Sequence, residues 1–381
     1  MAVSIEGRKM RYLRSFIEKD LEKKIVLLGG PRQVGKTTLA QSYKGEYFNW
    51  DNDDDRQSII NKMWDDEKRL LVFDELHKRP KWKTWIKGIY DKEKNKHSFL
   101  VTGSARLDVY RKGGDSLLGR CHHWRLHPFT LDEHPANMSK DEVFKRLMSI
   151  GGFPEPFIEK DPDFVRRWRK ERFDRVIRED IRDLENIRDI NSLSLFADML
   201  RSRVGGMIEP SNMARDIQVA PKTALHWLDV LEKMYIGFSI KPFTKNINRS
   251  IVRPPKFYFF DNGDVIGDEG SRFENLIATH LLKRLHFIED SEGYRMGLHY
   301  LRDKDNHEVD FVISRDGVIE EIIEAKLNDN NISSGLIYFK ERHKAKRVVQ
   351  IVANLSKKMT RNGVELLSPL DYFSRPPWDK K

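Results

Sequence analysis

The chain has 381 residues, 39% of them hydrophobic and 34% charged, a length that predicts two or three domains, each with a core of its own. The single cysteine, Cys121, excludes internal disulfides and cysteine zinc clusters. The sequence has no run of about 18 apolar residues, and residues 1–10 have no signal-peptide pattern, so we expect a cytoplasmic protein that does not enter a membrane. The net charge of +10 favours polyanionic partners, of which nucleic acid is the first candidate.

A phosphate-binding loop is predicted directly after a short apolar strand at residues 25–28. The stretch GGPRQVGKTTLAQ follows, and residues 30–37 fit the pattern GxxxxGKT between a strand and a helix. Glycines let the backbone wrap phosphate groups with its N–H donors, Lys36 reaches the β- and γ-phosphates, and the Thr37 hydroxyl coordinates Mg²⁺. The predicted ATP contacts are Gly30, Pro31, Arg32, Gln33, Val34, Gly35, Lys36, Thr37 and Thr38.

Two further apolar strands each end in polar residues. In RLLVFDELHK, four apolar residues lead to Asp74 and Glu75 at the carboxyl end of a strand, the edge of a parallel sheet where ligands bind. Asp74 is predicted to hold the Mg²⁺ shell, and Glu75 to orient or deprotonate the attacking water. In SFLVTGSA, a polar side chain between Thr102 and Ser104 could sense the γ-phosphate. Ser104 fits this role and equally fits an ordinary cap on a helix that begins near residue 105.

These motifs, in this order, resemble those of AAA+ ATPases. The resemblance implies an arginine just before the fifth strand of the core that reaches the ATP of a neighbouring subunit, and therefore a homo-oligomer. Arg120 in SLLGRCHHWRLHPF stands at the matching point. Its rivals are Arg106, Arg111 and Arg125, and the remaining alternative is a solvated surface arginine.

Residues 131–191 are expected to form the helical lid that this resemblance implies. Apolar residues recur at helical spacing among dense charges in FVRRWRKERFDRVIREDIRDLENI. Either Arg175 or Arg178 touches phosphate from this lid, or the charges form a solvated face.

Residues 192–262 resemble a winged-helix domain, a frequent reader of DNA. The pattern predicts a short helix at 211–217, a second helix at 222–234, and two apolar strands in IGFSIKPF and PKFYFF. The seam of the second helix is expected at Thr223, Leu225, Leu228 and Leu231, and its exposed side at Lys222, His226 and Trp227. Because those side chains are a thin set for reading bases, the module either contacts DNA or packs on the lid or a neighbouring subunit.

Residues 263–381 are expected to contain an amphipathic helix followed by a charged hairpin. In GSRFENLIATHLLKRL, the residues Phe273, Leu276, Ile277 and His280 have core spacing, and Glu274 lies near the helix start. In HEVDFVISRDGVIEEIIEAK, strands at 308–314 and 318–327 flank the turn dipeptide Asp316-Gly317.

The register of this hairpin decides what its charges do. With a two-residue loop, Asp310 faces Ile323 and the acids point to opposite sides of the sheet. A loop of three or five residues instead sets Asp310 against Glu324, and Glu308 against Lys326, all on one side. We predict the second register, because the first would scatter the charges over both faces of the sheet. Ionised groups are costly to bury unless paired, and a divalent cation is the usual partner of two converging carboxylates. The alternative is an exposed edge hairpin whose charges face water.

This part of the chain resembles the PD-(D/E)xK nuclease fold, with "VD" in place of "PD". The resemblance implies that Asp310 and Glu324 bind Mg²⁺ or Mn²⁺, that Glu274 is an additional metal-binding acid, and that Lys326 steadies the attacking water or the developing phosphorane charge. Taken whole, the chain resembles prokaryotic AAA+ ATPases with a C-terminal nuclease-like domain. The expected α/β fold is therefore an AAA+ core at 1–130, a lid at 131–191, a winged helix at 192–262 and a restriction-endonuclease-like domain at 263–381.

Two functions are consistent with these expectations. In the first, an ATP-hydrolysing oligomer acts on DNA and its C-terminal domain cleaves DNA with Mg²⁺ under the control of the nucleotide. In the second, an ATP-driven switch or remodeller binds DNA or a protein partner through that domain without cutting.

Overall fold

The computed structural model describes residues 11–103, 117–135, 137–181, 187, 189–244, 253–328 and 331–379. Two compact units make up the chain. The first is built from residues 8–127 with 233–235, and the second from residues 1–7, 128–232 and 236–381. Among the residues described, no helix has the length and apolar character needed to cross a membrane.

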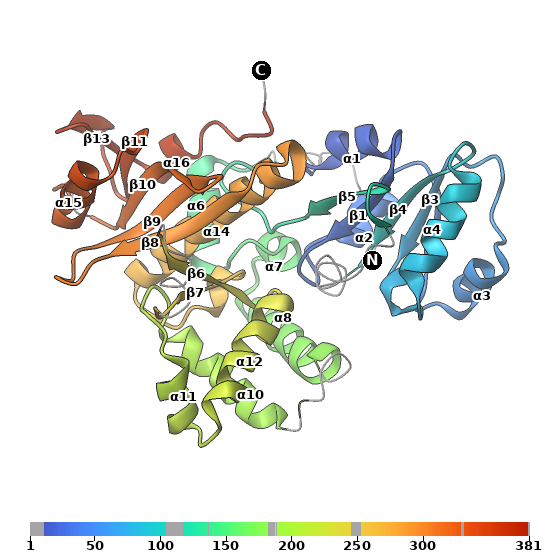
Figure 1. Cartoon of the computed structure of the whole chain (residues 1–381), viewed down its shortest axis with the longest axis horizontal. Helices are drawn as coiled ribbons and strands as arrows, with labels where there is room; N and C mark the ends of the chain where they lie inside the picture. The colour runs from blue at the N-terminus through green and yellow to red at the C-terminus, as the bar shows by residue number, and fades with distance from the viewer. Residues whose placement is uncertain are drawn as a thin grey trace. The chain divides into compact units, whose positions relative to one another are not determined.

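The first unit is a parallel five-stranded sheet in the order β2-β3-β4-β1-β5 (Figure 1). Its strands are β1 (Ile25–Gly29), β2 (Glu46–Asn49), β3 (Leu70–Asp74), β4 (Ser98–Thr102) and β5 (Cys121–Arg125), and its helices are α1 (Arg14–Leu21), α2 (Lys36–Gln41), α3 (Asp53–Asn61), η1 (Leu76–Lys78) and α4 (Trp82–Glu93). Strands β1 and β3 are buried at every residue, as expected for apolar runs covered on both faces. The carboxyl ends of β1, β3 and β4 therefore meet at one edge of the sheet.

The helical part of the second unit agrees with the predicted pattern. Its helices are α6 (Lys140–Ser149), α7 (Pro154–Glu159), α8 (Pro162–Arg175), the π-helical turn η4 (Val176–Asp180), α10 (Ile190–Arg201), α11 (Pro210–Asp216) and α12 (Pro221–Lys233). The short helix expected at 211–217 and the second helix expected at 222–234 are α11 and α12.

The predicted faces of α12 are partly wrong. Trp227 is buried at 3% exposure and packs edge-on against Phe196 of α10, whereas Leu225, expected in the seam, is 55% exposed. A tryptophan offers the largest apolar area on this helix, so packing against α10 takes precedence over a role at the surface. Lys222 and His226 are exposed as expected. The winged-helix assignment stays a prediction.

An eight-stranded sheet in the order β12-β13-β11-β10-β9-β8-β6-β7 dominates the rest of the second unit (Figure 1). Its strands are β6 (Gly237–Pro242), β7 (Lys256–Phe259), β8 (Met296–Arg302), β9 (Glu308–Arg315), β10 (Val318–Lys326), β11 (Arg347–Val352), β12 (Met359–Arg361) and β13 (Val364–Leu367). The strands expected as a separate wing are β6 and β7, and β6 pairs in parallel with β8. One sheet therefore crosses the division expected between residues 262 and 263, and that division stays a prediction.

Helix α14 (Glu269–Glu292) runs along β8 and β10 (Figure 1), and the remaining elements are η5 (Asn262–Asp264), α15 (Ser334–Arg342) and α16 (Pro369–Tyr372). The core spacing predicted for α14 is confirmed, because Phe273, Leu276, Ile277 and His280 are all at most 2% exposed. Asp268 caps the start of the helix by accepting a hydrogen bond from Ser271 N.

A buried ionic cluster joins α8 and α10 to the η5 turn. The Arg172 guanidinium lies 3.3 Å from Asp264 Oδ2, and Arg201 lies 3.2 Å from Asp264 Oδ1. Arg169 lies 3.7 Å from Asp261, whose side chain is 1% exposed. Because leaving one of these charges unpaired inside the protein is costly, the cluster fixes α8, which lies in the predicted lid, and α10 to the η5 turn.

Candidate functional sites

The loop after β1 has the backbone shape that a phosphate cradle requires. Gly30 has φ +138°, and a Cβ at this position would lie 2.4 Å from the carbonyl oxygen of Leu126. Gly35, at the start of α2, has φ +96°. Both conformations are accessible to glycine and disfavoured for other residues, so the two glycines of the pattern are required by the fold of the loop itself.

The Lys36 side chain hydrogen-bonds to the backbone of this loop. Its Nζ donates hydrogen bonds to the carbonyl oxygens of Gly30 at 3.0 Å and Pro31 at 2.7 Å. Arg11, which no sequence motif singled out, donates from one guanidinium nitrogen to Val34 O at 2.8 Å and from the other to His127 O. The loop is therefore held in shape by two cations whose donors bind its own carbonyl oxygens or those beside it.

Asp74 is the point where three strand ends and the loop meet. Its Oδ2 accepts hydrogen bonds from the Thr37 hydroxyl at 2.7 Å and the Tyr47 hydroxyl at 2.6 Å. Its Oδ1 accepts from the Thr102 hydroxyl and from Glu75 N, the latter at 3.1 Å. A carboxylate held by four donors keeps one orientation, with Oδ2 directed at the threonine predicted to bind Mg²⁺. The sequence located Thr37, Asp74 and Thr102, but it missed Tyr47.

Glu75 is placed by a strained turn at the end of β3. Its φ is +56°, a left-handed conformation that is uncommon outside glycine and that clusters at functional sites. Burial raises the pKa of Glu75, and the ammonium groups of Lys78 and Lys36 oppose this rise. Its Oε2 lies 3.6 Å from Lys78 Nζ and 3.5 Å from His77 Nε2. A carboxylate with a raised pKa is a better proton acceptor than an ordinary glutamate, which suits the predicted role.

The predicted trans-acting arginine lies at the other edge of the sheet. Arg120 precedes β5, which runs parallel to β1 with Cys121 opposite Ile25, so it lies at the amino ends of the strands while the loop lies at their carboxyl ends. Its Nε donates to Asp91 Oδ1 at 2.8 Å. Arg120 therefore does not serve the site of its own chain, and its action on a neighbouring subunit stays a prediction.

Other candidates for the nucleotide site fall outside the described residues or remain predictions. Ser104, Arg106 and Arg111 lie outside the described residues. Arg125 ends β5 opposite Gly29 and is 9% exposed. In the second unit, Arg178 pairs with Asp174 at 3.6 Å, and its predicted contact with phosphate is untested.

The register predicted for the C-terminal hairpin is confirmed, but the loop predicted to produce it is wrong. The turn is the two-residue Asp316-Gly317, with positive φ at both residues, and Val318 pairs with Arg315. The register then shifts between Ile319 and Glu321, because Glu320 is an extra residue in its strand. A β-bulge of this kind moves the partner by one residue and sets Asp310 against Glu324.

The carboxylates of Asp310 and Glu324 approach one another across the two strands. Glu324 Oε2 accepts from Asp310 N at 3.4 Å, and Asp310 Oδ2 accepts from Ala325 N at 3.0 Å. Burial, and then the Asp310 charge, raise the pKa of Glu324 to about 7, against the opposing effect of Lys326. The Lys326 ammonium lies 2.8 Å from Glu324 Oε1.

These side chains line an open pocket of about 360 Å³. Its walls are formed by Asn306, His307, Glu308, Asp310, Glu324, Lys326, Ser333, Ser334 and Gly335. Two carboxylates that face each other at the wall of an open pocket are the oxygen donors that Mg²⁺ or Mn²⁺ prefers. The residues present therefore fit a divalent cation.

Glu274 does not line this pocket, although the sequence predicts it as a further metal ligand. Its Oε1 accepts from the Tyr258 hydroxyl at 2.7 Å and lies 3.4 Å from Lys256 Nζ. A Cβ at Gly205 would lie 2.5 Å from its Oε2. The carboxylate, whose side chain is 19% exposed, is therefore already engaged by Tyr258 and Lys256, and its role as a metal ligand stays a prediction.

Lys256 of β7 is the main residue of this region that the sequence did not reveal. Its side chain is 1% exposed, and its Nζ lies 2.7 Å from Glu308 Oε1 and 3.6 Å from Asp310 Oδ1. Burial lowers the pKa of Lys256, but the carboxylates of Glu274, Asp310 and Glu308 outweigh it and the net shift is upward. The only signal in the sequence is a lysine at the start of the apolar run PKFYFF.

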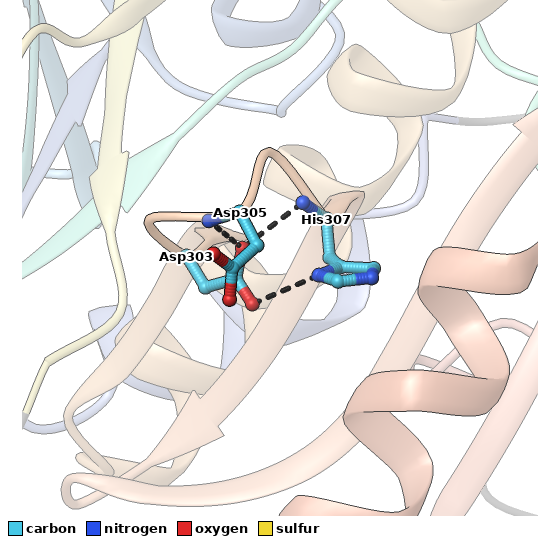
Figure 2. A group of neighbouring side chains, drawn as sticks. All are labelled: Asp303, Asp305 and His307. Carbon is cyan, nitrogen blue, oxygen red and sulfur yellow. Dashed lines mark hydrogen bonds and ion pairs between the residues drawn. The ribbon is translucent and has the colours of Figure 1, made fainter.

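The loop from Asp303 to His307, drawn in Figure 2, forms part of the pocket rim, because Asn306 and His307 line the pocket. Asp303 accepts hydrogen bonds from Asp305 N at 2.8 Å and from His307 N at 3.0 Å, and its Oδ2 lies 3.0 Å from His307 Nδ1. The Tyr338 hydroxyl, and then His307, lower the pKa of Asp303 to about 2. The His307 ring stacks on Tyr338 with centroids 3.8 Å apart. These bonds shape the rim and hold it against α15.

Three family models match successive parts of the chain. Residues 22–134 match the AAA domain, residues 141–265 match a domain of unknown function, DUF8612, and residues 269–372 match another, DUF4143. The chain carries an AAA-type ATPase domain. The match covers β1 to β5, and therefore the loop around Lys36 and the Asp74 cluster.

Curated relatives extend the likeness beyond this domain. The uncharacterized protein Rv2008c of Mycobacterium tuberculosis is 26% identical over 245 residues, which cover 63% of this chain and 54% of that protein. The chain thus spans about half the length of that relative. An uncharacterized protein of Haemophilus influenzae is 20% identical over 405 residues, covering 95% of this chain and 97% of its own length.

Among solved structures, the ORC1 protein of Aeropyrum pernix in complex with DNA is similar at 13% identity and a TM-score of 0.32, covering 71% of this chain and 93% of that one. A variant of RuvB from Thermotoga maritima has 15% identity and a TM-score of 0.31, covering 61% of this chain and 89% of that one.

Proposed function

We propose that the protein binds and hydrolyses ATP in its AAA domain. The observation that carries this proposal is the hydrogen bond from the Thr37 hydroxyl to Asp74 Oδ2, at 2.7 Å. It joins the end of the phosphate loop to the acid at the end of β3, which is the pair that holds a nucleotide-bound Mg²⁺ in P-loop enzymes. The glycine geometry at Gly30 and Gly35 supports the fit of phosphate groups.

Each residue has a defined task in this proposal. Lys36 exchanges its bonds with Gly30 O and Pro31 O for the β- and γ-phosphate oxygens. Thr37 and Asp74 hold Mg²⁺, which supplies charge to offset that of the phosphates. Glu75 accepts a proton from the attacking water, and Thr102, already bonded to Asp74, lies where a sensor of the γ-phosphate is expected.

ATP hydrolysis by three variants tests the proposal. Lys36→Ala is expected to lose nucleotide binding, because the loop keeps no ammonium for the phosphates. Glu75→Gln is expected to bind ATP normally and to hydrolyse it at least about 100-fold more slowly, because an amide does not accept the proton. Lys96→Ala, which removes an exposed lysine paired with Asp66 and no predicted catalytic group, is the control. Hydrolysis by Lys36→Ala and Glu75→Gln at the wild-type rate would refute the proposal.

We infer a second site, for a divalent cation, in the pocket of the C-terminal unit. It is supported by the register that sets Asp310 against Glu324 and by the Lys326 ammonium 2.8 Å from Glu324. Acids with a lysine beside them suit hydrolysis of a phosphodiester, in which Asp310 and Glu324 hold the ion and Lys326 offsets charge that develops on phosphate. The net charge of +10 and the polyanion preference that follows favour DNA as the substrate.

Cleavage and binding without cleavage are separated by one assay. Plasmid and linear DNA are incubated with Mg²⁺ or Mn²⁺, with and without ATP. Metal-dependent cutting that disappears in Asp310→Ala and Lys326→Ala supports a nuclease. A wild type that retains DNA in a filter-binding assay and leaves it intact under all conditions supports a switch or remodeller. Cutting that survives both substitutions would come from a contaminant and would leave the nuclease proposal refuted.

A further inference from the structure

Lys256 is a buried cation at the inner end of the acid cluster. Its Nζ is within 3.6 Å of three carboxylates, those of Glu308, Glu274 and Asp310, and the side chain is 1% exposed. An ammonium buried to this degree loses nearly all of its hydration, so these contacts have to replace it. The lysine therefore belongs to the cluster by structure and is not a side chain that happens to lie near it.

The cluster has two sides, and only the outer one lines the pocket. On the inner side, Lys256 and Glu274 are both absent from the pocket lining, and Glu274, whose side chain is 19% exposed, is held by the Tyr258 hydroxyl. On the outer side, Glu324 and Lys326 line the pocket. Asp310 connects the two, because its Oδ1 lies 3.6 Å from Lys256 Nζ while the residue itself lines the pocket.

We propose that the Lys256 ammonium is a built-in cation in the inner half of the cluster, so that the site takes a single divalent cation, held by Asp310 and Glu324 at the pocket. In this arrangement Glu274 serves the lysine and is not a metal ligand. The inference rests on the proposed divalent-cation site. It adds how many ions that site binds and where the Lys256 ammonium lies within it.

The consequence for chemistry is a restriction to one-ion mechanisms. Two-metal enzymes clamp the attacking and leaving oxygens of a phosphodiester between ions about 4 Å apart. Here a fixed ammonium takes the place of the inner ion, and it has neither the charge nor the open coordination positions of Mg²⁺. Lys326 at the pocket is then the remaining cation available to the scissile phosphate.

Counting ions tests the proposal without reference to activity. The full-length, nucleotide-free protein is titrated with Mn²⁺, and free Mn²⁺ is measured by electron paramagnetic resonance. The ions bound by wild type minus those bound by Asp310→Asn, with Glu324→Gln as a second subtraction, count the C-terminal site alone. A difference of one supports the proposal and a difference of two overturns it. A difference of zero would instead refute the divalent-cation site itself.

Substitution of the lysine gives an independent test. Lys256→Met removes the ammonium that three carboxylates share, although Glu308 keeps its pair with Arg302. Its melting temperature is therefore expected to fall without Mn²⁺ and to rise on adding Mn²⁺ by more than that of wild type. Lys283→Met is the matched control, because Lys283 is equally buried and pairs with Glu133, away from the pocket. Equal Mn²⁺-induced shifts in Lys256→Met, Lys283→Met and wild type would overturn the proposal.

Glu274→Gln keeps the proposal testable if Lys256→Met does not fold. An acid that serves the lysine leaves the pocket ion in place, so Mn²⁺ affinity in Glu274→Gln is expected to stay within about threefold of wild type. A loss of more than about tenfold would show that Glu274 is itself a ligand of the ion, and the assignment of the inner half to Lys256 would be wrong.

Discussion

Tyr47 and Asp74 are joined by a hydrogen bond of 2.6 Å from the phenol hydroxyl to Oδ2, the same oxygen that accepts from Thr37. Tyr47 lies on β2, at the edge of the sheet, and reaches across to the end of β3. It therefore fixes the orientation of the proposed Mg²⁺-holding acid from the side opposite the phosphate loop.

Removal of this hydroxyl is expected to weaken the use of Mg²⁺ more than the binding of nucleotide. In Tyr47→Phe, Asp74 keeps its charge but loses one of its orienting donors, so the Mg²⁺ concentration for half-maximal ATP hydrolysis should rise by about threefold to tenfold. A hydrogen bond to a charged group contributes about 1.5–3 kcal/mol, so unfolding in urea should also become easier. Tyr43→Phe, which loses a hydroxyl bonded to Arg14 O, is the control, and an identical Mg²⁺ response in both variants would contradict the assignment.

Alanine at Gly30 is expected to abolish nucleotide binding by steric means alone. Its Cβ would lie 2.4 Å from Leu126 O, and φ +138° is not accessible to alanine without strain, so the loop has to move away from the phosphates. Gly88→Ala is the matched control, because a Cβ at this position in α4 would meet no atom within 4 Å. That variant should be more stable by up to about 1 kcal/mol and bind ATP normally. Fluorescent-nucleotide titration and urea unfolding measure both effects, and ATP binding by Gly30→Ala at wild-type affinity would contradict the proposed loop.

If Arg120 acts on the ATP of a neighbouring subunit, hydrolysis per subunit should increase with protein concentration, and Arg120→Ala should suppress that increase. The Arg120–Asp91 pair offers a control within the same contact, since Asp91→Asn removes the ion pair but leaves the arginine. Asp91→Asn should keep the concentration dependence. A hydrolysis rate per subunit that is independent of protein concentration would contradict this role. Equal losses of hydrolysis in Arg120→Ala and Asp91→Asn would show that Arg120 acts only through its ion pair with Asp91.

His280 predicts a loss of stability on the acid side of neutrality. Burial lowers the pKa of His280 from 6.5 to about 4, and its ring bonds Leu131 N and Leu276 O as the neutral form. The charges around it are Asp132, which raises the pKa, and Lys283 and Arg284, which lower it.

Because the unfolded chain takes up a proton near pH 6.5 and the folded chain does not, the free energy of unfolding should fall as the pH drops from about 6.5 to 4. The limiting effect is about 3 kcal/mol. Urea unfolding of wild type and His280→Gln at several pH values measures this effect. The difference between their free energies of unfolding should become smaller toward pH 4. Asp261 has a pKa raised to about 6 by burial and contributes in the opposite sense, so the comparison has to be made between variants and not from wild type alone. Parallel curves would contradict the assignment to His280.

Local pattern was sufficient for much of the fold. The loop at residues 30–37 is contiguous, and its glycines, lysine and threonine act through the backbone that carries them, so no distant residue had to be known. The same holds for the positions of α11 and α12 along the chain and for the core face of α14, where the spacing of apolar residues agrees with burial.

The hairpin shows where local pattern stops. Its residues predict that Asp310 faces Glu324, and this is correct, but the shift comes from a bulge at Glu320 and not from a longer turn. No residue type in this sequence marks the bulge, because its position depends on how the two strands pair along their whole length. Trp227 is the related case for a helix, since the face that it occupies is decided by α10.

The sequence by itself determined the pattern of the loop at residues 30–37 and the pairing of Asp310 with Glu324, because short-range backbone geometry and strand alternation place those residues. Only the tertiary structure decided that β6 and β7 join the sheet of β8 to β13, and this pairing brings Lys256 to Glu274, Glu308 and Asp310. The reason is physical: a buried charge is stable only where partners distant in the sequence converge on it, and no local pattern encodes that convergence.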